Sequence, residues 1–170
     1  GEQKRPALEL AGKPAPTFQL NTRSGHGVSN AEFGNYRATV LNFVAPNCGF
    51  CQRQIPKIDR IRGEFEPAGV RFVNVSEQMG SQTFTPEAAE AKYAGFGSGL
   101  ELAIDANNAV GKLFKATAYP TMFVIRADGV VQHVNIGAKE NIDEILKQQL
   151  SSLLGDNAPT SQPAKANVGG

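Results

Sequence analysis

The chain has 170 residues, of which 41% are hydrophobic and 19% charged, a composition typical of one globular domain with its own core. Its formal net charge is +1 without a basic stripe or an acidic block, so the charge pattern indicates no nucleic-acid partner. No apolar run approaches the length of a membrane-spanning helix, and the first residues lack the apolar stretch of a signal peptide. The start at Gly1 is still compatible with a signal or anchor that has been removed.

Composition predicts one folded region between two ends of low pattern. We expect a flexible spacer over residues 1–11 and a single domain over residues 12–155. Residues 156–170 are rich in Gly, Pro, Ser, Asn and Ala, which is typical of a flexible tail.

The first half of the domain predicts a hairpin and then a strand, a helix and a second strand. Residues 17–30 have the pattern of two short strands around a glycine-containing turn. Residues 39–44, TVLNFV, are almost continuously apolar, as expected of a strand buried on both faces. Isoleucines at helical spacing predict a helix to about residue 66, and residues 70–76 predict a second buried strand.

The second half begins with a helix start at Thr85, where a capping hydroxyl precedes Pro86 and an acid. Residues 100–105 predict a short strand and residues 108–117 a short helix. Residues 121–137 predict a hairpin, because Asp-Gly between two apolar runs favours a turn.

The last predicted element is a helix with a broad apolar face. Asn141 followed by Glu144 has the spacing of a capping box at its start. The alternation of strands and helices predicts an α/β fold, with a mixed sheet between helical layers. Strands 39–44 and 70–76 would be parallel, joined by a right-handed helical crossover.

Cys48 and Cys51 are the only cysteines of the chain, and they lie where a buried strand passes into a helix. Unpaired backbone N–H groups and the helix dipole stabilise a thiolate at a helix start, so Cys48 is predicted to be the nucleophile. Cys51 lies one turn further and is placed to resolve a mixed disulfide. Two cysteines this close would restrain the unfolded chain little, which argues against a structural staple.

A metal site and a pair of inert buried thiols are the competing interpretations of the cysteines. A structural zinc site needs four ligands, and only His26 and His133 could complete one, neither with a ligand-spaced partner. Copper meets the same shortage of ligands. Gly49 and the strand-to-helix junction favour an exposed redox pair instead.

Of three further residues, Pro120 and Glu77 have ordinary structural interpretations on their own, and Asn42 is less usual. Pro120 precedes a predicted strand, where a proline cannot donate to the sheet. Glu77 ends a strand, where a surface acid is ordinary. Asn42 lies in a buried strand and must find hydrogen-bond partners there.

Three segments in this order resemble the TlpA/ResA-like thiol–disulfide oxidoreductases, which have the thioredoxin fold and belong to the AhpC/TSA–redoxin superfamily. The segments are TVLNFVAPNCGFCQRQIPKI, VRFVNVSE and AYPTMFVIRADGVVQHVNIG. The resemblance covers about residues 13–154. It implies a mixed central sheet flanked by helices, an N-terminal β-hairpin and an inserted segment after the second main strand.

The resemblance also implies roles for individual residues. Cys48 and Cys51 would be the redox pair, without a cofactor or a metal. Pro120 would be a cis-proline facing them, with Tyr119 and Thr121 offering backbone groups to an extended substrate. Glu77 matches an acid near the cysteines that would transfer protons. Asn42 occupies the place of a buried Asp in thioredoxins, where ResA-like proteins commonly have Asn.

The chain departs from the family beside the cysteines. Asn47 stands where relatives usually have Trp, and Val44 stands where another aromatic residue is common. The partner-facing surface is therefore more polar, with Asn47 a candidate substrate contact. Peroxiredoxins place Thr and Pro where this chain has Ala45 and Leu41, so a peroxidase is disfavoured.

The resulting hypothesis is an enzyme that exchanges disulfides with protein substrates, such as an apocytochrome, and with a membrane or soluble redox partner. The resemblance implies an extracytoplasmic location, periplasmic or tethered to the membrane through a lost N-terminal segment. The alternative is a thioredoxin-like binding or metal-chaperone module without redox turnover.

Overall fold

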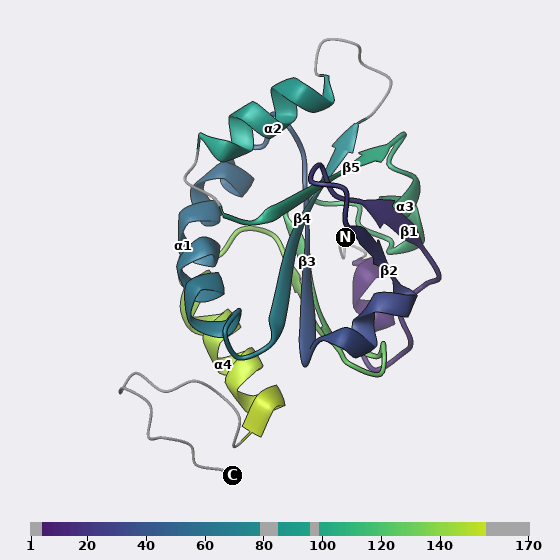
Figure 1. Cartoon of the computed structure of the whole chain (residues 1–170), viewed down its shortest axis with the longest axis vertical. Coiled ribbons are helices and arrows are strands. Elements are labelled where there is room, and N and C mark those ends of the chain that lie inside the picture. The colour runs from purple at the N-terminus through teal and green to yellow at the C-terminus, as the bar shows by residue number, and fades with distance from the viewer. Residues whose placement is uncertain (1–4, 79–84, 96–98, 156–170) are drawn as a thin grey trace.

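A five-stranded mixed sheet is the centre of the computed structural model, which describes residues 5–78, 85–95 and 99–155 (Figure 1). Its strand order is β5-β4-β3-β6-β7. The strands are β3 (Ala38–Val44), β4 (Val70–Gln78), β5 (Glu101–Ala106), β6 (Thr121–Arg126) and β7 (Val131–Ile136). Strand β3 pairs in parallel with β4 and antiparallel with β6, so the predicted mixed sheet and parallel pair are confirmed.

The predicted N-terminal hairpin is also confirmed. It consists of β1 (Gln19–Asn21) and β2 (Gly27–Ser29), which pair antiparallel as a separate two-stranded sheet. The other elements are helical: η1 (Pro6–Leu10), η2 (Asn30–Asn35), α1 (Gly49–Phe65), α2 (Pro86–Ala94), α3 (Ala109–Leu113) and α4 (Ile142–Leu154). The helix start at Thr85 is confirmed too, because its hydroxyl accepts a hydrogen bond from the N–H of Ala88 at 3.1 Å.

Alternation along β3 sends successive side chains to opposite faces of the sheet. Val40 packs with residues of α1 and α4, which lie together on one side of the sheet (Figure 1). Leu41 and Phe43 pack in the core of the other side, under η1, the β1–β2 hairpin and α3. Every residue of β3 is buried, as its apolar run predicts. A short loop, residues 45–47, connects the end of the strand to Cys48.

Two expectations at the ends of the domain need correction. Residues 6–10, within the predicted spacer, form η1, where Ala7 and Leu10 are buried in the core, so the folded part starts earlier than expected. Asn141 makes no capping hydrogen bond through its side chain. Its φ of −101° and ψ of 33° are not the extended conformation of a capping residue. The predicted tail, residues 156–170, lies outside the described residues.

Within the described ranges, the structure contains no helix that combines the length and apolar character needed to cross a membrane.

Candidate functional site

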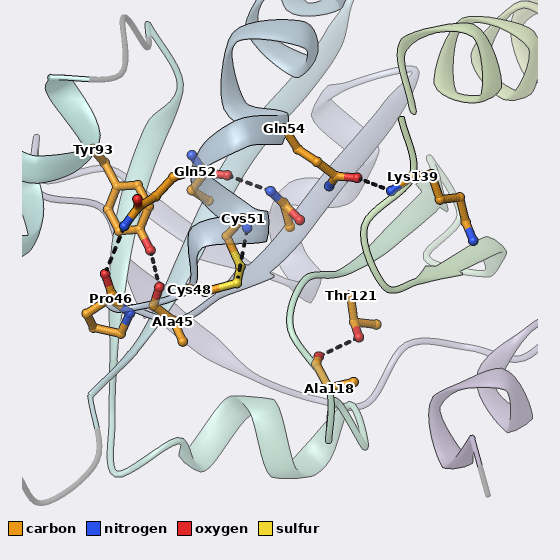
Figure 2. Close-up of a disulfide and its surroundings, with 12 residues drawn as sticks. Ala45, Pro46, Cys48, Cys51, Gln52, Gln54, Tyr93, Ala118, Thr121 and Lys139 are labelled. Atoms are coloured by element: carbon orange, nitrogen blue, oxygen red, sulfur yellow. Dashed lines mark hydrogen bonds between the residues drawn. A yellow bond between two sulfur atoms is a disulfide. The ribbon is translucent and has the colours of Figure 1, made fainter. Parts of the chain in front are cut away.

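The two cysteines form a disulfide at the first turn of α1 (Figure 2). Cys48 is the N-cap residue of the helix, and its Sγ accepts a hydrogen bond from the N–H of Cys51 at 3.0 Å. Cys48 is half-buried, whereas Cys51 is 0% exposed. Cys48 is therefore the more accessible of the two cysteines to a partner in solution.

The loop before Cys48 is held from two directions (Figure 2). The carbonyl of Ala45 accepts hydrogen bonds from the N–H of Cys48 at 3.2 Å and from the hydroxyl of Tyr93 at 2.7 Å. The side-chain amide of Gln52 donates to the carbonyl of Pro46 at 3.3 Å. These bonds satisfy carbonyl groups near a helix start and fix the position of Cys48. Asn47, between them, is exposed.

Tyr119 and Pro120 are joined by a cis peptide bond immediately before β6. Tyr119 packs against the apolar cluster that contains the buried Cys51, and Cys48 packs against the same cluster. The carbonyl of Pro120 accepts from the N–H of Gly137 at 2.8 Å, and the hydroxyl of Thr121 donates to the carbonyl of Ala118 at 2.7 Å. In the described part of the chain, the backbone N–H and C=O of Tyr119 have no hydrogen-bond partner.

Glu77 is connected to this segment through a side-chain hydrogen bond. It lies half-buried near the end of β4, and its Oε2 accepts from the hydroxyl of Tyr119 at 3.0 Å. The same hydroxyl lies 3.2 Å from the Oδ1 of Asn108. Glu77 is therefore an acid held by the side chain of the residue that precedes Pro120.

Asn42 has a buried amide as its neighbour on β4. Its Nδ2 donates to the Oδ1 of Asn74 at 3.1 Å, and the two residues are register partners. Within the described residues its own Oδ1 is buried without a hydrogen-bond partner. Neither amide titrates, so this pair cannot exchange a proton with the cysteines.

Neither histidine lies on the elements that carry the disulfide. His26 is in the β1–β2 turn, where its side chain is 71% exposed and its Nδ1 lies 3.8 Å from Glu101. His133 is on the edge strand β7, where burial lowers its pKa. Across the described ranges, no three His, Cys, Asp or Glu side chains gather in a way that could hold a metal ion.

Several residues around the cysteines carried no recognisable signal in the sequence. Tyr93 and Gln52 hold the loop, but each looks like an ordinary helical residue. The buried Gln54 accepts a hydrogen bond from the N–H of Lys139 at 2.8 Å and ties α1 to the loop after β7 (Figure 2). Phe50 did stand out in the sequence, because Gly49-Phe50 between the cysteines differs from the Gly-Pro of thioredoxin, and it is 58% exposed.

Burial changes the acid–base behaviour of Tyr93 and Tyr119. It raises the pKa of Tyr93 to about 12, and nearby Glu77 acts in the same direction. Burial also raises the pKa of Tyr119, and the hydrogen bond to the carboxylate of Glu77 adds to this effect.

We expect these raised pKa values to appear in an alkaline titration followed by phenolate absorbance near 295 nm. The signal is clean because the chain has three Tyr and no Trp. Tyr93→Phe and Tyr119→Phe should each remove amplitude from the most alkaline part of the curve. Since the unfolded state ionises first, the stability that neutral Tyr93 contributes is present below pH 10 and is lost towards about pH 12. A single wave near the ordinary tyrosine value, with all three rings titrating together, would contradict this expectation.

Comparison with known proteins decides the family. The AhpC/TSA family matches residues 11–134. The chain belongs to the AhpC/TSA family. The thiol–disulfide oxidoreductase ResA of Geobacillus kaustophilus is 28% identical over 80% of this chain and 76% of its own length. The thioredoxin-like protein YneN of Bacillus subtilis is 25% identical over 74% of this chain and 71% of its own.

Solved structures agree with the fold. A Chlorobium tepidum protein, provisionally assigned as the thiol:disulfide interchange protein DsbE, superimposes with a TM-score of 0.75 at 24% identity, over 85% of this chain and 98% of its own. A secreted disulfide oxidoreductase of Mycobacterium tuberculosis does so with a TM-score of 0.65 at 18% identity, over 80% and 96%. This family member thus has the TlpA/ResA-like thioredoxin fold that its sequence resembles, and its class is that of the thiol–disulfide oxidoreductases.

Proposed function

We propose that the protein exchanges disulfides with protein substrates through Cys48 and Cys51, as a disulfide reductase outside the cytoplasm. The observation that carries the proposal is the difference in burial between the two cysteines. Cys48, at the start of α1, is half-buried, and Cys51, one turn later, is fully buried. Thiolate stabilisation at a helix start and access to solvent both favour Cys48 as the attacking sulfur.

In the reduced protein, the Cys48 thiolate attacks one sulfur of a substrate disulfide. That S–S bond breaks, one substrate thiolate leaves, and Cys48 becomes joined to the substrate in a mixed disulfide. The Cys51 thiolate then attacks the sulfur of Cys48 and releases the second substrate thiolate. Two electrons pass to the substrate, and the enzyme ends in the disulfide form that the structure contains.

The segment before β6 is the proposed binding site for the substrate backbone. The free backbone N–H and C=O of Tyr119 offer the two groups that an extended strand needs for antiparallel pairing. Pro120 itself offers no N–H, and Thr121 uses its hydroxyl on the carbonyl of Ala118. We therefore assign substrate binding to Tyr119, with Pro120 and Thr121 shaping the segment and Asn47 contacting the partner from the opposite loop.

The resemblance to the TlpA/ResA-like group supports a location outside the cytoplasm, with a membrane tether before the present N-terminus. It also supports a separate redox partner that returns Cys48 and Cys51 to the reduced state. Reduction of secreted proteins, including apocytochromes during cytochrome c maturation, fits this placement. The direction of exchange depends on the potential of the pair, where about 30 mV corresponds to 1.4 kcal/mol.

The alternative is a module that holds a metal or a partner without turnover, and two measurements on the purified protein separate it from the proposal. We expect the reduced protein to carry no stoichiometric metal and to precipitate insulin B chain in the presence of dithiothreitol. One metal ion per chain bound through both thiols, with no insulin reduction, would replace the proposed function by the alternative.

Glu77 is proposed to accept and supply the proton during exchange, acting beside Tyr119. Glu77→Gln removes the titrating group and keeps the shape, so the pH dependence of the reaction of the Cys pair with iodoacetamide should change while the fold persists. Tyr119→Phe keeps the carboxylate but removes its donor at 3.0 Å, so the profile should change by a smaller amount. Circular dichroism controls for folding. A pH profile that is identical to wild type in Glu77→Gln would return Glu77 to an ordinary surface acid.

A further inference from the structure

A groove lies beside the cysteine pair, between the first turns of α1 and the loop that joins β7 to α4. Its volume is about 430 Å³, and Phe50 and Arg53 line its α1 side. Ala138 and Lys139 line the other side. Because Phe50 stands between the two cysteines in the sequence, the groove begins next to the cysteine pair.

The groove is a fixed feature of the fold. Gln54 is 4% exposed, and its Oε1 accepts a hydrogen bond from the backbone N–H of Lys139 at 2.8 Å (Figure 2). The ammonium of Lys57 donates to the backbone carbonyl of Glu140. These two hydrogen bonds join α1 to the β7–α4 loop at two points, Gln54 and Lys57, which are about one helical turn apart.

The α1 side of the groove offers an exposed aromatic ring. Phe50 is 58% exposed, although an isolated phenylalanine gains free energy when it is covered. The guanidinium of Arg53 lies over this ring, 4.7 Å from its centroid. An apolar contact and a cation are therefore presented together, next to the cysteines.

The charge of the groove is unbalanced. Within the described residues, none of Arg53, Lys57 and Lys139 forms an ion pair with a carboxylate. Further along the same helix, in contrast, Arg60 pairs with Asp143 and Arg62 pairs with Asp59.

The hydrogen bonds of these cations leave their charge uncompensated. Those of Lys57 and Lys139 go to backbone carbonyls, of Glu140 and Ile136. Among the described residues that line the groove, Glu140 is the one acid, against three cations.

We infer that this basic groove binds an acidic segment of the substrate protein, next to the disulfide that Cys48 attacks. The inference rests on the proposed function and adds the class of substrate to it. Carboxylates of the partner would find three unpaired cations, and an apolar side chain of the partner would cover Phe50. Charges at the edge of an interface act mainly on the association rate and on the choice of partner, so selectivity is where the groove should be visible.

The test compares two peptides of equal length that contain the same internal disulfide, one flanked by Asp and Glu and the other by Lys. We expect kcat/KM of the wild type to favour the acidic peptide by about tenfold at low ionic strength, and the ratio to fall as salt is added. Arg53→Glu combined with Lys139→Glu should abolish or invert the ratio. The ratio is the readout because it cancels any effect of these changes on the chemistry of the thiols.

The matched control is Lys13→Glu combined with Arg37→Glu. It changes the net charge by the same amount at exposed positions. Arg37 comes just before the first residue of β3, whereas the cysteines follow the last residue of that strand. This control should keep the wild-type ratio. Equal kcat/KM for both peptides, or a ratio unchanged in Arg53→Glu/Lys139→Glu, would overturn the basic groove.

Hydroxyethyl disulfide, a small neutral substrate, separates this failure from failure of the proposed function. Its reduction by the wild type needs the cysteines but no acidic segment. If it is reduced while the peptides are not distinguished, only the groove is wrong. If neither it nor the peptides are reduced, the proposed function is wrong.

Discussion

Cys48→Ser should lose all disulfide reduction, down to the rate of buffer without protein. The hydroxyl of serine is not ionised near neutral pH, and Cys51, which is 0% exposed, cannot take over the attack on a protein substrate. Cys51→Ser should behave differently, because Cys48 still attacks but nothing resolves the product. The mixed disulfide between Cys48 and the substrate should therefore accumulate.

Insulin reduction measures the loss of turnover in both variants, and non-reducing gels with mass spectrometry detect the trapped complex in Cys51→Ser. The doubly substituted Cys48→Ser/Cys51→Ser protein is the control for noncovalent binding. Full activity in Cys48→Ser would refute the assignment of the nucleophile. A mixed disulfide that forms through Cys51 in Cys48→Ser would reverse the order of the two roles.

Phe114→Ala should lower the free energy of unfolding by about 3–5 kcal/mol, the usual cost of removing a buried phenylalanine. Phe114 is 0% exposed at the end of α3. Its ring centroid lies 5.2 Å from those of Phe18 and Phe43 and 5.0 Å from that of Phe123. The ring thus joins β3 and β6 to the segment that precedes β1, and its removal leaves a cavity between them.

Leu113→Ala is the matched control, because Leu113 is the preceding residue and is 49% exposed. Its cost should stay within about 0.5 kcal/mol, as for other surface positions. Urea unfolding of both variants in the disulfide form measures the difference. A loss below about 1.5 kcal/mol in Phe114→Ala would mean that the surrounding rings close the cavity.

Local patterns predicted most of the secondary structure. The apolar run of residues 39–44 became β3, buried throughout, because only a central strand covered on both faces accommodates such a run. The isoleucines at helical spacing became the buried face of α1. The helix η1 was missed, because residues 6–10 are too few to show a helical period. Its burial comes from contacts of Ala7 and Leu10 with the core, which the local sequence does not show.

The capping box at Asn141 shows the limit of a motif taken alone. Its spacing was correct and α4 begins where expected, but the backbone turn closes through the N–H of Ile142 and the carbonyl of Lys139 at 3.1 Å. The loop is also tied to Gln54, far away in the sequence. Tertiary contacts of this kind override a local preference worth only about 1 kcal/mol.

The sequence by itself predicted a dithiol–disulfide pair, because two cysteines separated by two residues at a strand-to-helix junction are a local pattern. The tertiary structure decided the surroundings of the pair. It buried Cys51 fully and Cys48 only in part, and it brought Tyr93 to Ala45 across 48 positions and Tyr119 to Glu77 across 42. Such contacts depend on which strands become neighbours, and no local period in the sequence records that order.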